Sequence, residues 1–381
     1  MNSNESSKPH AAKIAPELGH KIRAVSFVCA AAVVLLHAYN QSLDGASHPV
    51  AAFVETLFSR ELCSVAVPMF FMISGFLLAR NFIPPIGTWY CGTVKKRVRS
   101  LLAPYLLWCT IYALTVLPFT VFGNYLSGRA IIHNTCLTEP LLSVENIFRI
   151  YGSDLFGFPA DGPLWYVRNL MMLVLISPLL LWVRRRRAGI ILCLVLGLLF
   201  CFQDWIPDPY WQFFESGFSL RGIFFCAVGM FLGLHPISFA PSGRGVLLML
   251  AVWLGLSAWG TCLLLYARSS APDFLRLVHR VAIFPGLASI WFAYEQLPVF
   301  RGLAYRRRAK YSFFLYAVHF GLMGILFCRR LESAVRSIIG EYSELPLYIL
   351  RFAVTLTVAL LAAHLLNRFS TRMYSRLSGG R

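Results

Sequence analysis

The chain of 381 residues is 57% hydrophobic and only 14% charged, well above the apolar share and below the charged share of an ordinary soluble domain. Its net charge of +18 could indicate nucleic-acid binding, but the basic residues are distributed as membrane topology requires, so we expect no nucleic-acid partner. These values exclude an ordinary soluble domain and predict a protein embedded in membrane lipid.

Ten apolar segments can be laid along the chain, and a membrane-spanning helix needs about 20 such residues. Every backbone amide in hydrocarbon must find its partner within its own segment, so each segment is predicted to be a helix. The predicted fold class is all-α, a polytopic membrane helical bundle of about ten transmembrane helices. The segments are 22–40, 62–79, 101–122, 164–183, 188–202, 216–234, 246–266, 281–297, 311–328 and 346–366, of which the fifth is short.

The loop charges predict that both termini are cytoplasmic. With the N-terminus in the cytoplasm, most of the 35 Lys and Arg residues face inwards, including those of 80–99 and of the run 184–187. We therefore predict a cytoplasmic tail at 1–21, one transmembrane domain at 22–366 and a second cytoplasmic tail at 367–381. No removable signal peptide is expected, because no cleavage site follows the first apolar run.

The ten cysteines form no C-x-x-C pair, and most lie within the predicted spans. A free thiol in such a place behaves as a small hydrophobe. We predict no metal site and no disulfide framework, and leave open a disulfide between Cys136, in an outer loop, and a cysteine near a span end.

In the first span, "SFVCAAAVVLLHAYNQS", an apolar run is followed by His37. Ser26 and Arg23 precede it by eleven and fourteen residues, and at about 100° per residue they project on nearly the same face. That face carries a cation at the cytoplasmic end and a titratable base farther up, as a general base aligned with an anionic substrate requires. A neutral imidazole bonded to a neighbouring helix is the alternative.

The second span, "AVPMFFMISGFLLAR", contains polar and small residues in its interior. Pro68 bends the axis, while Ser74 and Gly75 allow close backbone approach and place a hydroxyl in the bundle. A kinked helix packed through small residues explains the pattern equally well.

Clustered basic residues precede the third span in "TVKKRVRSLLAPYLLW". Cytoplasmic loops carry such residues in any membrane protein. The alternative is a cradle for a polyanion such as a nucleotide, held by charge-assisted hydrogen bonds. The residues concerned are Lys95, Lys96, Arg97 and Arg99.

Later spans place aromatic and ionisable residues near their outer ends. In "DGPLWYVRNL", Trp165 belongs to the interfacial aromatic belt, whereas Arg168 lies deeper than a belt residue. In "KYSFFLYAVHFGL", Tyr316 and His319 are three residues apart on one helix face and form a hydrogen-bonding pair or a shared substrate wall. Arg351, near the outer end of the tenth span, is expected to snorkel to the interface.

Together these segments resemble the family 3 membrane acyltransferases, which include O-acetyltransferases of bacterial surface polysaccharides. The likeness runs in order from the terminal His of the first span through "VPMFFMISGFLL", "KKRVRSLLAPYLLW", "PLWYVRNL" and "RGIFFCAVGMFLG" to "SFFLYAVHF". It implies ten helices in the bacterial plasma (inner) membrane. It also implies transfer of an acyl group, most often acetyl, from coenzyme A in the cytoplasm to a hydroxyl on the other side.

The resemblance also implies roles for single residues. His37 matches the essential first-span histidine, and Ser74 falls in the Ser-Gly-Phe motif. Lys96 and Arg99 fall where the family keeps a pair of basic residues next to the coenzyme A phosphates. The family commonly has Arg or Lys eleven residues before the histidine, where this chain has Ser26.

We therefore expect an integral membrane O-acyltransferase of a cell-surface glycan or its precursor, with acyl-CoA (acetyl-CoA) as donor substrate and no tightly bound cofactor. Expected partners are membrane lipid, acyl-CoA, a carbohydrate acceptor and other glycan-biosynthesis proteins. The alternative is a non-catalytic exporter or scaffold component of envelope polysaccharide biosynthesis. The expected site consists of the base His37; of Arg23, Ser26, Ser74, Lys96, Arg97 and Arg99 for acyl-CoA; and of Trp165, Arg168, Tyr316 and His319 for the acceptor.

Overall fold

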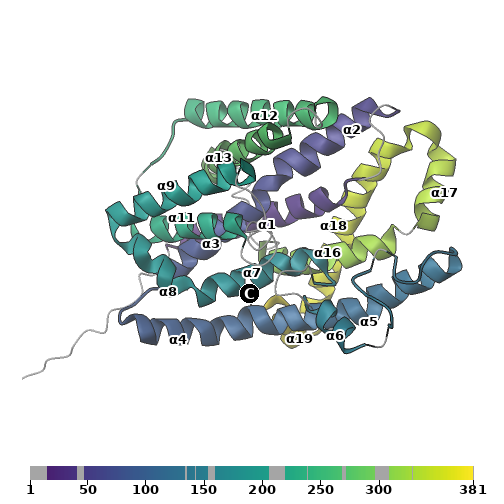
Figure 1. The fold of residues 1–381 in the computed structure, drawn as a ribbon, viewed down its shortest axis with the longest axis horizontal. Helices are drawn as coiled ribbons and strands as arrows, with labels where there is room; N and C mark the ends of the chain where they lie inside the picture. The colour runs from purple at the N-terminus through teal and green to yellow at the C-terminus, as the bar shows by residue number, and fades with distance from the viewer. Residues whose placement is uncertain are drawn as a thin grey trace, which may run out of the picture.

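The computed structural model contains only helices as regular secondary structure in the residues that it describes (Figure 1). The predicted fold class, an all-α polytopic membrane bundle, is confirmed. Residues 1–14 of the predicted N-terminal tail lie outside the described part. The described residues are 15–40, 47–133, 135–141, 143–152, 159–205, 219–237, 239–267, 272–296, 309–327 and 329–380.

Each of the ten predicted spans has a helical counterpart in the described part of the chain. Eight helices are long and apolar enough to cross a membrane, and a bent pair covering 162–184 brings the number to nine. The tenth counterpart, α11 (Leu220–Leu234), is apolar but shorter. Apolar side chains such as Leu114 and Leu248 are exposed on the outside of the bundle, where lipid replaces water as the solvent.

The bounds of the helices fix which residues each one carries. The helices are α1 (Pro16–His37), α2 (Pro49–Glu55), η1 (Thr56–Glu61), η2 (Leu62–Val65), α3 (Ala66–Arg80), α4 (Ile86–Arg97), η3 (Val98–Leu102), α5 (Ala103–Leu126), α6 (Val144–Ile150), η4 (Gly162–Leu164), α7 (Trp165–Leu175), α8 (Ser177–Leu180), η5 (Leu181–Arg184), α9 (Arg186–Phe202) and η6 (Gln203–Trp205). After α11 they are α12 (Gly243–Tyr266), α13 (Pro272–Gln296), η7 (Ala309–Tyr311), α16 (Ser312–Leu326), α17 (Arg329–Ile339), η8 (Gly340–Ser343), α18 (Glu344–Phe369) and α19 (Thr371–Ser378).

Helices α1, α3, α11 and α16 form the middle of the bundle (Figure 1). α3 packs against both α11 and α1, while α1 also packs against α16, and α16 against α18. The continuous helix α4–η3–α5 runs along one edge, and α12 runs along the opposite edge with α13 packed against it. We call the end of the bundle at His37 the outer end and the opposite end the inner end, following the topology predicted from the loop charges.

Helices α3 and α11 approach each other closely enough to exclude side chains between them. A Cβ on Gly229 would overlap the carbonyl oxygen of Met72, and a Cβ on Gly75 would overlap that of Cys226. Small residues allow such packing where no hydrophobic effect drives helices together in lipid. The close approach predicted at Ser74 and Gly75 is confirmed.

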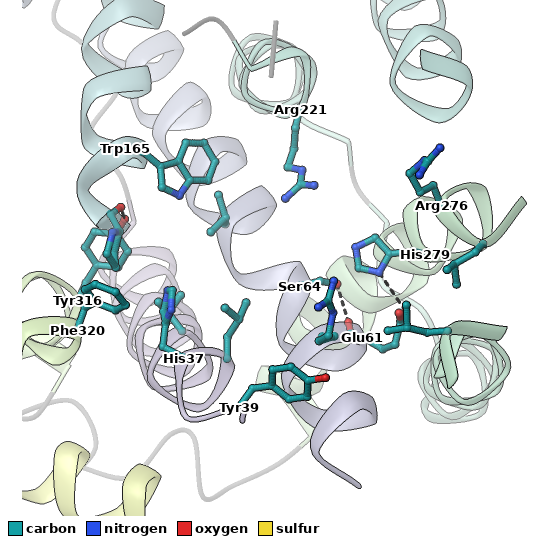
Figure 2. A pocket seen from close by; sticks show the side chains of 17 residues that line it. His37, Tyr39, Glu61, Ser64, Trp165, Arg221, Arg276, His279, Tyr316 and Phe320 are labelled. Carbon is teal, nitrogen blue, oxygen red and sulfur yellow. Dashed lines mark hydrogen bonds and ion pairs between the residues drawn. The ribbon is translucent and has the colours of Figure 1, made fainter. Parts of the chain in front are cut away.

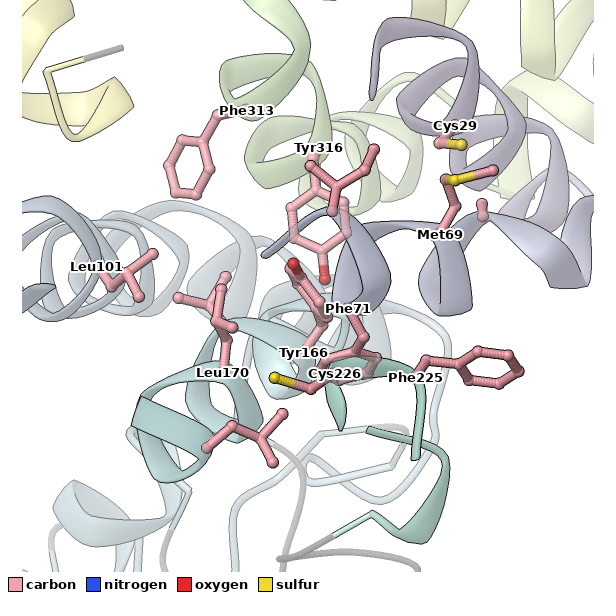
Figure 3. Packing of buried hydrophobic residues seen from close by; sticks show 14 of the residues in the cluster. Cys29, Met69, Phe71, Leu101, Tyr166, Leu170, Phe225, Cys226, Phe313 and Tyr316 are labelled. Carbon is pink, nitrogen blue, oxygen red and sulfur yellow. The ribbon is translucent and has the colours of Figure 1, made fainter. Parts of the chain in front are cut away.

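Aromatic rings fill the space beside this contact (Figure 3). The rings of Phe71 and Tyr166 lie 4.7 Å apart between centroids in an edge-to-face arrangement, and Cys226 of α11 lies against them. Tyr166 also contacts the ring of Tyr316 at 5.8 Å. α7 and α16 are therefore packed to α3 by one aromatic cluster.

The fourth predicted span is bent by 68° between α7 and α8. Pro178 has no backbone N–H, and its ring clashes with the carbonyl four residues earlier, which belongs to Val174. The hydroxyl of Ser177 donates to that carbonyl at 2.7 Å. The bend therefore leaves no unsatisfied backbone oxygen at Val174.

Most of the predicted C-terminal tail is helical. α19 carries Leu377, whose carbonyl accepts the indole N–H of Trp108 at 3.0 Å. The hydroxyl of Tyr374 donates to the carbonyl of Lys310 at 2.9 Å. The end of the chain is thus packed against α5 and η7.

Replacing Gly229 by Ala should destabilise the protein, because the added methyl group meets the backbone of α3. Overpacking typically costs about 1 to 3 kcal/mol, occasionally more. Thermal unfolding in detergent measures the effect, with Gly255→Ala on α12 as control, where nothing lies within 4 Å of the added carbon. An unchanged melting temperature for Gly229→Ala would contradict the close contact.

Candidate functional site

His37 is the last residue of α1 and lines a cavity of about 490 Å³ at the outer end of the bundle (Figure 2). We call this space the outer cavity. Residues of α1, η1, α3, α7, α11, α13 and α16 line it, so segments far apart in sequence meet at one histidine. Its aromatic and ionisable lining residues besides His37 are Tyr39, Arg60, Glu61, Trp165, Arg221, Arg276, His279, Tyr316 and Phe320.

The backbone on both sides of His37 is fixed by side chains from other helices. The last four carbonyls of a helix have no partner within it. The hydroxyl of Ser59 donates to the Leu35 carbonyl at 2.7 Å, and Nη1 of Arg351 donates to the Ala38 carbonyl at 3.2 Å. These bonds hold the end of α1 that carries His37 against η1 and α18.

The sequence analysis expected Arg351 to snorkel to the interface, and this prediction is wrong. Arg351 is buried, and its Nη2 lies 2.6 Å from Oε1 of Glu332 on α17. Arg336, on the same helix, pairs with Glu344 of α18, which also accepts the side-chain N–H of Asn40 at 3.1 Å. The prediction failed because it considered the length of the side chain and not a carboxylate supplied by the neighbouring helix.

His319 of α16 is fully buried beside His37, and their ring centroids are 5.1 Å apart. Nδ1 of His319 lies 2.7 Å from the carbonyl oxygen of Tyr316. A carbonyl only accepts, so this hydrogen bond assigns the proton to Nδ1 and leaves Nε2 with its lone pair in the neutral ring. Nε2 has no hydrogen-bond partner among the described residues. A buried acceptor nitrogen is therefore available next to His37.

The wall of the outer cavity away from His37 is basic. Arg60 comes from η1, Arg221 from the first turn of α11 and Arg276 from α13. Figure 2 shows Arg221 reaching into the cavity, with Trp165 on one side and His279 on the other. Among the described residues lining the cavity, Glu61 is the acidic one, and Nδ1 of His279 lies 3.1 Å from its Oε2.

A second cavity of about 350 Å³, the inner cavity, lies between the C-terminal end of α3, the loop that follows it and one face of α4. Lys96 and Arg97 line it together with Asn81 and Trp89. Arg97 is half-buried and interacts electrostatically with Tyr166 in the bundle interior. The indole N–H of Trp89 has no hydrogen-bond partner among the described residues. The inner cavity thus combines two cations with an unused donor.

One face of α3 contributes residues to both cavities. Val67 lines the outer cavity and Leu78 the inner one, and Ser74 lies between them on nearly the same face. The eleven residues from Val67 to Leu78 span about 16 Å at 1.5 Å per residue. Midway, the hydroxyl of Ser74 lies 3.1 Å from that of Tyr166, whose ring contacts Tyr316 of the outer cavity. Ser74 and Tyr166 thus place two hydroxyl groups between the cavities, within the buried aromatic cluster.

Several predicted site residues lie outside both linings. Arg23 is exposed on α1, Ser26 is half-buried, and Arg99 is exposed on η3. Arg168 packs over Gly152, where an added Cβ would lie 2.6 Å from its Nη1. The structure brings together His37, Trp165, Tyr316 and His319 at the outer cavity, and Lys96 with Arg97 at the inner one.

Sequence reasoning missed Arg60, Glu61, Arg276 and His279, because it placed them in outer loops. The second span was predicted to begin at 62 and the eighth at 281, but the helices begin at Pro49 and Pro272. Charged residues at helix ends depress hydropathy and shorten a predicted span. The three-residue spacing of Arg276 and His279, continuing the face of the following helix, was the available signal.

Comparison with known proteins gives a family match and one relative. The sequence model of the family described as "Acyltransferase domain" matches residues 21–364. The Succinoglycan biosynthesis protein ExoH of Rhizobium meliloti (strain 1021) is 22% identical over 331 residues, which are 86% of this chain and 82% of that protein. No solved structure matches significantly. The matched range includes His37 and the linings of both cavities.

Replacing Arg351 by Leu should lower the free energy of unfolding by about 3 kcal/mol, the low end for a broken buried ion pair, because Glu332 is partly exposed. Adding Glu332→Leu should recover part of the loss, since the stranded carboxylate is removed. Thermal unfolding of the single and double variants measures both effects. Arg149→Leu, which breaks an exposed pair with Glu145, serves as control with an expected cost of about 0.5 kcal/mol. Equal stability of Arg351→Leu and wild type would contradict the bracing role.

Proposed function

Because the chain belongs to acyltransferase family 3, we propose that it transfers an acyl group, acetyl in the simplest case, from acyl-coenzyme A to a hydroxyl of a cell-surface polysaccharide or its precursor. Family membership and the helical bundle make it a membrane acyltransferase. The donor, the acceptor and the bacterial plasma membrane as location belong to the proposal. The observation that carries it is His37 at the outer cavity, with a basic inner cavity lined by the other end of α3.

The inner cavity suits the nucleotide end of the donor. Lys96 and Arg97 supply charge-assisted hydrogen bonds to phosphate oxygens. The indole N–H of Trp89 is a further donor, buried and unused. The pantetheine arm then runs along α3 past Ser74 and brings the thioester to His37.

The outer cavity suits a sugar acceptor. Trp165, Tyr316 and Phe320 present aromatic surface, and the volume lies in the range of small-molecule sites. The role that the name of the similar Rhizobium protein states, succinoglycan biosynthesis, supports a polysaccharide as acceptor.

In the proposed reaction, neutral His37 accepts the proton of the acceptor hydroxyl, whose oxygen forms a bond to the thioester carbonyl carbon. The carbon–sulfur bond of the resulting tetrahedral intermediate then breaks. The leaving thiolate takes the proton back from the His37 imidazolium, so coenzyme A departs as a thiol. Protons and charges balance with no other reactant.

His319 acts on His37 in this scheme. Protonated His37 has two N–H donors, of which one faces the reacting oxygen. Nε2 of His319 is a lone-pair acceptor beside the ring, so a small rotation lets it accept the second N–H. Once formed, that hydrogen bond also holds neutral His37 in one tautomer, as the third member of a catalytic triad does.

Replacing His37 by Ala should lower the rate about 10² to 10⁴-fold, because the general base is lost. The measurement is release of free thiol from acetyl-CoA by purified protein in lipid, with an extract of envelope glycan as acceptor. His364→Gln, which changes an exposed histidine on α18, is the matched control and should leave the rate unchanged.

Two outcomes would contradict the proposal. Full activity of folded His37→Ala would exclude His37 as base. An intact thioester, with the glycan still dependent on the protein in cells, would favour an exporter or scaffold component of polysaccharide biosynthesis.

The two substitutions His319→Gln and His319→Leu should lower the activity to different extents. Gln keeps an oxygen acceptor toward His37 and is expected to retain more activity than Leu, which has none. We expect the Leu variant to be about tenfold or more slower at saturating substrate, with an altered pH profile of kcat. Identical rates and pH profiles for both variants would show that His319 only fills space.

A further inference from the structure

Glu61 carries a buried carboxylate at the outer cavity, and its ion-pair partner is a histidine. The residue is 3% exposed, and its Oε2 lies 3.1 Å from Nδ1 of His279 on α13. No Lys or Arg of the described residues lies within ion-pair distance of it, and Arg276 pairs instead with Asp204 and Asp273. A carboxylate only accepts hydrogen bonds, so this contact assigns a proton to Nδ1 of His279.

Neighbouring elements hold Glu61 in place. It is the last residue of η1, a π-helical segment, and such wide turns are frequent at functional sites. The hydroxyl of Ser64 donates to the Glu61 carbonyl at 2.6 Å. On α12, Gly260 leaves room for the carboxylate, because a Cβ there would lie 2.9 Å from Oε2 of Glu61. Glu61 therefore orients the ring of His279 as the Asp of a catalytic triad orients its histidine.

The second ring nitrogen of His279 is available to a ligand. The side chain is 24% exposed and lines the outer cavity. Nδ1 is bonded to Glu61, whereas Nε2 has no hydrogen-bond partner in the described part of the chain. In Figure 2, His37 and His279 lie on opposite sides of the cavity. A hydroxyl group both donates and accepts, so it can bond to Nε2 in either protonation state of the ring.

We propose that the His279–Glu61 pair binds a second hydroxyl of the acceptor while another hydroxyl reacts at His37. This inference rests on the proposed acyl transfer and names a substrate class for it, an acceptor with several hydroxyl groups on one sugar or on adjoining sugars. His279 then determines specificity. An alcohol with a single hydroxyl excludes water from Nε2 without replacing the hydrogen bond, and such a site rejects a ligand that lacks the bonding group.

Acceptor kinetics and equilibrium binding, both with the full chain in lipid, test the proposal. The acceptor is an oligosaccharide fraction of envelope glycan freed of esters by mild base, and cyclohexanol supplies a single hydroxyl on a six-membered ring. Thiol release from acetyl-CoA gives kcat and KM, while calorimetry gives the affinity for the oligosaccharide without turnover. The variants are His279→Leu, His279→Gln, Glu61→Gln and Gly260→Ala, with His133→Leu as an exposed control outside the cavity.

His279→Leu should raise KM for the oligosaccharide and weaken its binding about tenfold, with little change in kcat, because one hydrogen bond is lost. His279→Gln keeps a polar amide and should lose less. Glu61→Gln and Gly260→Ala, which change or displace the carboxylate that orients His279, should act in the same direction. Thiol release with cyclohexanol should be slower than with the oligosaccharide and independent of His279. His133→Leu should behave as wild type.

Unchanged oligosaccharide affinity in folded His279→Leu and Gly260→Ala would overturn the proposal, as would an equal loss of rate with cyclohexanol. A fall in kcat at unchanged KM would also overturn it, because His279 would then act on the reacting atoms. Binding that depends on His279 without any thiol release would uphold the contact and reject the proposed reaction, so the two failures are distinguishable.

Discussion

The carbonyl groups at the C-terminal end of α1 must find hydrogen-bond donors inside the bundle, and the position of His37 depends on which donors they find. Ser59 and Arg351 supply them from two other helices. An unpaired carbonyl in hydrocarbon would cost several kcal/mol, so this end of α1 has little freedom to shift. A requirement of the backbone thus fixes a catalytic candidate in place.

The same requirement extends outward from α1 through charged residues. Arg351, which donates to the Ala38 carbonyl, pairs with Glu332, and Asn40 is bonded to Glu344, which pairs with Arg336. α17, which carries Glu332 and Arg336, is therefore part of the support of the site although it does not line the cavity. Removing one charged residue of this network leaves its partner buried without a counter-charge, so the contributions of the paired residues to stability are not independent.

The sequence predicted the fold well, because composition and segment length are strong constraints in lipid. Ten apolar segments became helices, and Ser74 and Gly75 lie at a close helix contact as expected. The sequence analysis did not predict the break at Pro178 within the span 164–183, although proline and the hydroxyl before it act locally. The order of the spans also carried the family resemblance that the domain match confirmed.

The site was harder to predict, because its members meet through tertiary packing. Helical phase identified His37, but the partner of Arg351 lies on another helix and has no signature in the local sequence. Arg276 and His279 escaped notice because their charge excluded them from a hydropathy-defined span. Residues that lower hydropathy at a span end are the ones that can line an outer cavity, so the criterion that finds the helices hides part of the site.

Two neutral imidazoles in contact suit a transfer that consumes no net proton. In the proposed reaction the proton taken from the acceptor hydroxyl returns to the leaving thiolate, so the site needs only a temporary proton acceptor. A second proton on the pair is disfavoured, since two cations at 5.1 Å between ring centroids would repel each other in a low-dielectric interior. Nδ1 of His319 is bonded to the Tyr316 carbonyl, so Nε2 is the nitrogen left with a lone pair on the ring beside His37.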